Sequence, residues 1–373
     1  MATIYEVAQQ AGVSTATVSR AINGKVPVAA LTRRRIESAI RALGYEPNHV
    51  ARSLVTATTD TIAIVLPDIT NPFFPDLVKG IQLFADERRY TVLLLNTGAD
   101  PAREEHSLLA LRRKRVDGVI LVGMAMKGDR IVRALGGDVP VVVLDRSISG
   151  LDATLVALDN AEGARLATQH LIDLGHQAIA HITGSEGLPL VAQRLSAYRK
   201  TLRAARIRPE PDLVVAGDFT EDSGYRATDR LLAGGACFTA IFAANDLTAI
   251  GAMAALKAQG LSVPDDVSVV GFDAIHLSGY STPPLTTVRQ PAYEMGRRAA
   301  ELLIDSIRAT SVDKPTKVLF KPELIVRQSA ASVGGGGRSL ATPARREPLG
   351  AVGNSPPDSM SAALHRSSDT GKN

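Results

Sequence analysis

Apolar and polar positions follow two different periodic patterns along the chain. In about the first 58 residues, apolar side chains recur every three or four positions, as at Ile4, Val7 and Ala11, which is the spacing of one helix face. From about residue 60 to 330, short runs of valine, isoleucine and leucine alternate with helix-length amphipathic stretches. Because continuous apolar strands need cover on both faces, this alternation predicts an α/β fold with parallel sheets between helices.

The second region contains many short strand candidates. More strands are expected than one small sheet accommodates, so we predict two side-by-side α/β subdomains. The candidates are Thr61–Leu66, Thr91–Asn96, Gly118–Val122, Val141–Asp145, Leu155–Leu158, Ala178–Thr183, Leu213–Gly217, Ala240–Ala243 and Val267–Gly271.

The last region, about 331–373, has no such periodic pattern of apolar positions. It contains Gly334–Gly337 and is otherwise rich in serine, proline, glycine and alanine. Too little apolar surface is present to offset the entropy of ordering, so we expect a disordered tail. A DNA contact by Arg345 and Arg346 stays open.

The first region has the layout of a helix-turn-helix. A helix over Ile4–Ala11, a turn at Gly12 and a second helix over Ser14–Ile22 precede a third helix over about Thr32–Leu43. Ala29 has no side chain that caps a helix, although Thr32 could cap one that begins later. From this pattern alone, a three-helix bundle without a role in DNA binding is equally compatible.

Charge and cysteine content narrow the class of protein. The chain has 42 Lys and Arg against 38 Asp and Glu, and residues 1–58 alone account for this surplus of four. The single cysteine, Cys237, excludes an internal disulfide and a cysteine-rich zinc module. With no signal peptide and no apolar stretch of membrane-spanning length, we expect a cytoplasmic protein with no membrane partner. The common catalytic and nucleotide-binding motifs are absent, so we expect no enzyme activity, cofactor or metal.

Several short motifs in the first 54 residues are specific in combination: Ala2–Ala8 (ATIYEVA), Ala11–Ser14 (AGVS), Thr17–Arg20 (TVSR), Leu43–Tyr45 (LGY), Pro47–Asn48 and Val50–Leu54 (VARSL). Together they resemble the lactose/galactose-repressor family of bacterial transcription regulators, and the resemblance covers about residues 1–330. It implies a homodimeric regulator, in most cases a repressor, that binds a palindromic operator.

The resemblance also implies a division into domains. Residues 1–58 would form the DNA-binding headpiece, with a hinge helix over about 48–56. Residues 60–330 would form a periplasmic-binding-protein-like core of two Rossmann-like subdomains. The N-subdomain would comprise about 60–158 and 291–318, and the C-subdomain about 159–289 and 319–330.

The family's DNA contacts fall on the second helix and the hinge. Hydroxyl groups at the start of that helix can bond bases or phosphates, Arg20 can pair with guanine, and Ala16 offers apolar contact. In the hinge, a pair of Leu54 side chains from two subunits would wedge between base pairs; an ordinary linker helix is the alternative. The implied DNA-binding residues are Tyr5, Ser14, Thr15, Ala16, Thr17, Ser19, Arg20, Asn23, Ala51 and Leu54.

Polar and aromatic residues follow the predicted strands at their carboxyl ends, where open α/β sheets bind ligands. Their positions resemble the ligand site of ribose-binding proteins. The implied effector-binding residues are Asn71, Phe73, Phe74, Asp145, Arg146, Asn160, Arg194, Phe219, Asn245, Asp273 and Gln290.

The chemistry of this set suits a small neutral sugar. Phenylalanine rings pack on C–H faces, while carboxylate, guanidinium and amide groups bond hydroxyls. Two carboxylates opposite two guanidiniums predict a nearly neutral pocket, which disfavours an anionic effector. We therefore expect a monosaccharide such as ribose, with another sugar or a nucleobase corepressor as alternatives. A stand-alone sugar-binding protein is a further, less favoured alternative. Individually, Asp145 and Arg146 could form a strand-end salt bridge, and Phe73 and Phe74 could be core residues.

Overall fold

The computed structural model describes residues 2–23, 27–45, 58–309 and 314–333. The predicted hinge helix, with Ala51 and Leu54, lies outside the described residues, as do Arg345, Arg346 and the predicted tail from Gly334 onward.

Three helices form the N-terminal region: α1 (Ile4–Ala11), α2 (Thr15–Asn23) and α3 (Ala30–Leu43). A capping box of Thr3 and Glu6 begins α1, and Gly12 ends it with φ of +63°. The core of this region contains Val7, Val18 and Ile36. The predicted three helices are confirmed. Helix α3 begins directly after an Ala29 that makes no side-chain capping bond, so the later start at Thr32 is wrong.

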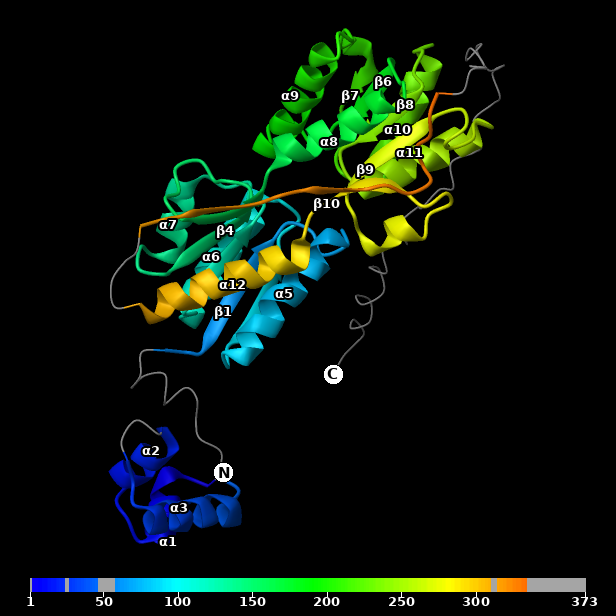
Figure 1. Ribbon diagram of the computed structural model, residues 1–373. Helices are drawn as coiled ribbons and strands as arrows, with labels where there is room; N and C mark the ends of the chain where they lie inside the picture. The colour runs from blue at the N-terminus through cyan, green and yellow to red at the C-terminus, as the bar shows by residue number, and fades with distance from the viewer. Residues whose placement is uncertain (1, 24–26, 46–57, 310–313, 334–373) are drawn as a thin grey trace, which may run out of the picture. The chain divides into compact units, whose positions relative to one another are not determined.

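The next part of the chain builds a six-stranded sheet, here called the sheet of the N-subdomain (Figure 1). Its strand order is β11-β5-β4-β3-β1-β2, and all pairs are parallel. On β1, Ile62 and Ile64 face α5 and α12, whereas Ala63 and Val65 face α6 and α7. The bounds are β1 (Thr61–Leu66), α5 (Phe73–Glu87), β2 (Thr91–Asn96), α6 (Pro101–Lys114), β3 (Gly118–Val122), α7 (Gly128–Leu135), β4 (Val141–Asp145), β5 (Thr154–Leu158), α12 (Ala292–Arg308) and β11 (Lys317–Phe320).

The C-subdomain repeats this plan with the strand order β12-β10-β9-β8-β6-β7. Helices α10 and α11 cover one face of its sheet, and α8 and α9 cover the other. The bounds are α8 (Asn160–Asp173), β6 (Ile179–Ile182), α9 (Pro189–Ala204), η1 (Pro211–Leu213), β7 (Val214–Val215), α10 (Glu221–Ala233), β8 (Ala240–Ala243), α11 (Asp246–Ala258), β9 (Ser268–Asp273), η2 (His276–Gly279), β10 (Thr286–Arg289) and β12 (Glu323–Ile325).

Each predicted strand is present, most within one or two residues of its predicted bounds. The C-terminal strands β10, β11 and β12 were not predicted. Two threonines in β10, Thr286 and Thr287, are buried, which a hydropathy pattern does not indicate. Strand β12 is antiparallel to β10, so the second sheet is mostly but not wholly parallel.

Among the described residues, no helix combines the length and the apolar composition needed to cross a membrane.

Candidate functional site

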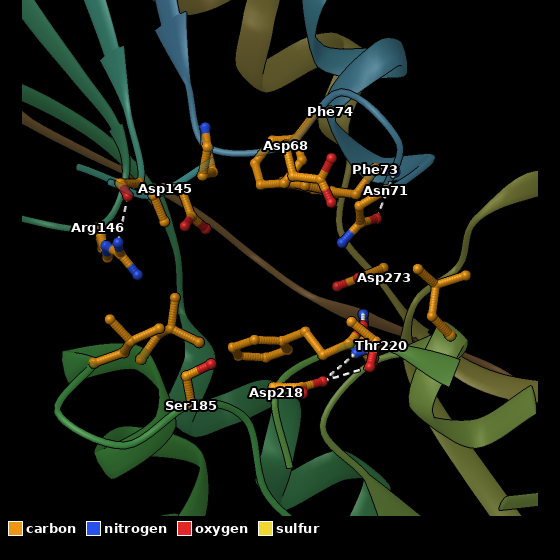
Figure 2. A pocket seen from close by; sticks show the side chains of 18 of the residues that line it. Asp68, Asn71, Phe73, Phe74, Asp145, Arg146, Ser185, Asp218, Thr220 and Asp273 are labelled. Atoms are coloured by element: carbon orange, nitrogen blue, oxygen red, sulfur yellow. Dashed lines mark hydrogen bonds between the residues drawn. The ribbon is translucent and has the colours of Figure 1, made fainter. Parts of the chain in front are cut away.

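The carboxyl ends of strands from both sheets meet around one cavity of about 640 Å³. In each sheet the first strand lies between the second and the third in chain order, a topological switch point at which doubly wound sheets bind ligands. Figure 2 shows side chains from the two subdomains on opposite sides of a common open space.

The structure gathers nearly all of the predicted effector-binding residues at this cavity. Those that line it are Asn71, Phe73, Phe74, Asp145, Arg146, Arg194, Phe219, Asn245, Asp273 and Gln290. Asn160 does not line the cavity. It is 3% exposed and lies behind Arg194, whose guanidinium it contacts.

Arg194 is held on three sides. Its Nε donates to Asn160 Oδ1 at 2.9 Å and its Nη1 donates to the carbonyl oxygen of Ala244 at 2.6 Å. The guanidinium carbon lies 3.6 Å from the centroid of the Phe272 ring. No hydrogen bond within the described residues uses Nη2. Burial lowers the pKa of Arg194, although Asp273 and Asp145 oppose this shift, and an arginine stays charged in either case.

Asp273 is buried, and its carboxylate and the guanidinium of Arg194 attract each other electrostatically. Burial raises the pKa of Asp273 to about 7, opposed by Arg194 and by a hydrogen bond from Gln290. Gln290 Nε2 donates to Asp273 Oδ1 at 2.6 Å, while Gln290 Oε1 is buried and has no partner among the described residues. An acceptor without a partner at a cavity wall is suited to a ligand hydroxyl.

Asn245 connects two parts of the same wall. Its Nδ2 donates to the carbonyl oxygen of Phe219 at 3.0 Å, and its Oδ1 accepts from the backbone N–H of Thr248 at 2.9 Å. The Phe219 ring packs on Gly184, where a Cβ atom would lie 2.0 Å from the ring. A glycine at position 184 is therefore required for this placement of the aromatic wall.

On the N-subdomain side, Arg146 is anchored through backbone atoms. Its Nη2 donates to the carbonyl oxygens of Gly123 and, at 3.3 Å, Met124. The same loop is held by the buried Glu104, which accepts from the N–H groups of Ala125 at 2.9 Å and Met126 at 2.8 Å. Burial lowers the pKa of Arg146, opposed by Asp145 and Glu104. Glu104 thus positions the loop beneath Arg146 without lining the cavity.

Phe73 and Phe74 form an edge-to-face pair with ring centroids 5.3 Å apart. Phe73 belongs to the hydrophobic core as well as to the cavity wall, so the core interpretation of this residue is partly correct. Phe74 is half-buried and supplies the accessible aromatic surface.

Strained backbone marks the same strand ends. Asp145, Phe219 and Asp273 have φ of +78°, +71° and +106°, and Ala274 follows at +57°. Such conformations cost roughly 1–3 kcal/mol each for residues other than glycine and persist where the surrounding structure imposes them. Their concentration at one cavity supports a functional role for it.

The cavity is more acidic than the sequence predicted. Asp68, Asp218 and Glu221 also line it, so the expectation of two carboxylates opposite two guanidiniums is wrong. Asp68 and Asp218 each accept from the backbone N–H and the hydroxyl of a threonine two residues later. The repeated Asp-x-Thr at the ends of β1 and β7 is the sequence signal that could have identified them.

Most of the predicted DNA-binding residues lie on α2 or just before it, and Tyr5 lies on α1. Ser14 Oγ accepts from the N–H of Thr17 at 3.2 Å and lies 2.9 Å from Thr17 Oγ1, so it also caps the helix. Ser14, Ala16 and Arg20 are exposed, as is Tyr5 on α1, whereas Thr15, Thr17 and Ser19 are half-buried. The side chain of Asn23 lies outside the described residues. An exposed helix start with hydroxyl groups and an arginine is suited to the major groove.

Two family models match the chain. Residues 3–48 match "Bacterial regulatory proteins, lacI family", and residues 168–330 match "Periplasmic binding protein-like domain".

Similar proteins match over most of their length. The chain is 36% identical to the HTH-type transcriptional repressor CytR of Escherichia coli K12, over 89% of this chain and 97% of that protein. It is 38% identical to the ribose operon repressor of Halalkalibacterium halodurans, over 86% and 96%. The solved lac repressor dimer, bound to operator and the anti-inducer ONPF, has a TM-score of 0.79 at 30% identity, over 88% and 99%.

Proposed function

Because the chain belongs to the lacI family of bacterial regulatory proteins and is a DNA-binding transcriptional repressor, we propose that it binds a near-palindromic operator as a homodimer controlled by a monosaccharide, with ribose favoured. No catalytic step, cofactor or metal ion enters this proposal.

The observation that carries the proposal is the convergence of the predicted residues on one cavity. The cavity combines aromatic surface from Phe74 and Phe219 with buried hydrogen-bonding groups from Arg194, Asp273 and Gln290. Rings stack on the C–H faces of a sugar, and the charged groups bond pairs of hydroxyls. The similarity to a ribose operon repressor supports ribose as the first candidate.

For the DNA, the exposed start of α2 is the proposed reading surface. The N-terminal residues of such a helix contact base edges in the major groove. Two copies related by a two-fold axis require two matching half-sites, which makes the operator near-palindromic. Tyr5, Ser14, Thr15, Ala16, Thr17, Ser19, Arg20 and Asn23 are the proposed headpiece contacts; Ala51 and Leu54 remain predictions.

Several large apolar side chains are exposed on the single chain, and formation of a dimer could bury them. Leu277 and Tyr280, in and beside η2, are 53% and 74% exposed, and Leu94 on the edge strand β2 is exposed too. Large apolar side chains on an otherwise polar surface favour association. The lac repressor, a dimer in its solved structure, supports the same state here.

Control of DNA binding requires the sugar to bind two states of the protein with different affinity. The cavity is lined by both subdomains, so a ligand that contacts both walls favours the arrangement in which they are close. We propose that this arrangement disfavours operator binding, so that the sugar releases the DNA.

Titration calorimetry with a panel of pentoses, hexoses, disaccharides, nucleobases and nucleosides tests the effector. Ribose or a close pentose should bind best. Tighter binding by a nucleobase or nucleoside would contradict the sugar proposal and support the second candidate, a repressor controlled by a nucleobase or nucleoside. One observation supports a nucleobase or nucleoside as the second candidate. The cavity of about 640 Å³, with additional carboxylates at Asp68, Asp218 and Glu221, offers more space and more hydrogen-bond acceptors than one pentose uses.

A further inference from the structure

Basic residues gather at the edge of the N-subdomain sheet that is opposite to the cavity. Helix α6 ends in Arg112, Arg113 and Lys114, and Arg115 follows as its left-handed cap. All four are exposed, and within the described residues none of them forms an ion pair. At the end of α5, Arg88 and Arg89 are exposed as well. We call these six residues the basic rim.

Hydrogen bonds show that the two halves of the basic rim lie on either side of one chain segment. Thr59 Oγ1 donates to the carbonyl oxygen of Arg115 at 3.1 Å, and its N–H donates to Asp117 Oδ1 at 2.8 Å. On the other side, the N–H of Thr91 donates to the carbonyl oxygen of Asp60 at 2.8 Å. The segment that leads from the headpiece into β1 therefore enters the sheet between the two basic turns.

The favourable interaction of cations with the helix dipole does not explain why so many basic residues lie at the end of α6. One cation in the last turn is worth about 0.3–1 kcal/mol, and the effect fades beyond that turn. Four adjacent cations repel one another and lower the stability of the helix end. In the C-subdomain, α9 has only Arg203 in its last turn, and the nearby Arg208 lies 3.7 Å from Glu210.

The chain connection limits how far this edge can be from operator DNA. The span from Tyr45, the end of the described headpiece, to Thr58 covers at most about 45 Å when fully extended. Any less extended path brings a bound operator closer. Unpaired cations within reach of a duplex attract its phosphates, and the attraction is strongest within about 10 Å at 0.1 M salt.

We propose that the basic rim binds the phosphate backbone of the DNA flanking each half-site, as a second DNA contact in addition to the headpiece. The proposal rests on operator binding by the headpiece. Phosphate contacts carry no sequence information, so the basic rim would add affinity and not specificity.

The test compares two duplexes and two charge variants. The full-length protein first selects an operator from a randomised DNA pool. That operator is made as a short duplex, cut at the outer ends of the half-sites, and as a long duplex extended by about one helical turn on each side. The variants are Arg113→Gln with Lys114→Gln in the basic rim and Lys200→Gln with Arg203→Gln on α9 as the matched control. Binding is followed by fluorescence anisotropy between 50 and 200 mM salt.

On the long duplex, the basic-rim variant should bind about tenfold more weakly than the wild type. The slope of log K against log salt should fall by about 0.9 for each phosphate that the variant no longer neutralises. On the short duplex this variant should match the wild type, and the control should match the wild type on both duplexes. Neither variant should have a lower unfolding midpoint than the wild type.

Wild-type affinity and slope on the long duplex would overturn the proposal. An equal loss on both duplexes would overturn it too, because the charges would then act through the headpiece. If the wild type selects no operator at all, the proposed function fails together with the basic rim.

Discussion

The two subdomains share a strand order and contribute to one cavity, yet they hold their polar groups in different ways. In the C-subdomain, Arg194, Asn245 and Asp273 are at most 7% exposed. Arg194 and Asp273 are fixed by the side chains of Asn160 and Gln290, whereas Asn245 is fixed by backbone groups. In the N-subdomain, Asn71 and Arg146 are half-buried, and within the described residues Arg146 bonds only to backbone carbonyl oxygens.

This difference indicates which wall binds first. Groups that are already fixed lose little entropy when a ligand arrives, and buried polar groups gain most from a partner. The C-subdomain wall should therefore carry most of the binding free energy. The N-subdomain wall should add an aromatic contact to the ligand and close the cavity around it. Substitutions in one wall, compared with substitutions in the other, test this asymmetry.

The largest effect is expected from Arg194→Ala. Removing the side chain of a buried, hydrogen-bonded charged group costs about 2–5 kcal/mol, so effector affinity should fall by about 30-fold or more. Calorimetry with the best-binding sugar measures this loss. The matched change in the other wall, Arg146→Ala, should cost clearly less. Equal losses in the two variants would remove the asymmetry.

Asn160→Ala should come next, although Asn160 does not touch the cavity. The change leaves the Nε of Arg194 buried without a partner, which costs about 1–3 kcal/mol and lets the guanidinium move. A loss of roughly tenfold in sugar affinity is expected from calorimetry, with operator affinity unchanged in the absence of sugar. Full sugar affinity in this variant would show that Asn160 does not position Arg194.

Effector affinity should depend on pH through Asp273, whose pKa is about 7 because of burial. The groups around it are Arg194, Gln290, Asp145 and Asp246. Sugar hydroxyls donate to the ionised carboxylate, so affinity should rise with pH up to about 7 and level off above it. Below 7 it should fall by up to about tenfold per pH unit.

The unliganded protein should show the opposite trend. Between pH 4 and 7 the folded state binds more protons at Asp273 than the unfolded state, so its contribution to the free energy of unfolding decreases as pH rises. Asp273→Asn should remove this contribution and flatten the pH dependence of sugar binding. Chemical denaturation and calorimetry at pH 5.5, 7 and 8.5 measure the two effects, and a wild-type-like pH profile in Asp273→Asn would contradict the assignment.

The smallest effect is expected from Phe74→Leu in the N-subdomain wall. The change keeps apolar volume but removes the ring that faces the cavity, which should cost about 0.5–1.5 kcal/mol. Affinity should fall a few-fold for sugars in calorimetry. A loss as large as that of Arg194→Ala would place the main binding wall in the N-subdomain instead.

Most of the fold could be predicted, because the alternation of strands and helices brings strand ends such as those at Asp145 and Asp273 to one edge. Ten of the cavity residues could be predicted from that placement together with the resemblance to ribose-binding proteins. The supporting roles of Asn160, which was predicted as a ligand contact, and of Glu104 could not be predicted. Asn160 acts on Arg194 across 34 residues of sequence, and Glu104 bonds to the N–H group of Ala125, 21 residues later. Such pairs depend on how α8, α9 and α6 pack, which local periodicity does not encode. Strand β12 was missed because it is short and antiparallel.

The most direct test of the central claim is the operator affinity of the full-length protein, measured by fluorescence anisotropy with and without the best-binding sugar. Saturating sugar should release the wild-type protein from the selected duplex. Arg194→Ala should bind the same duplex and keep it at the same sugar concentration. An operator affinity of the wild type that is identical with and without saturating sugar would contradict the claim that the cavity controls DNA binding.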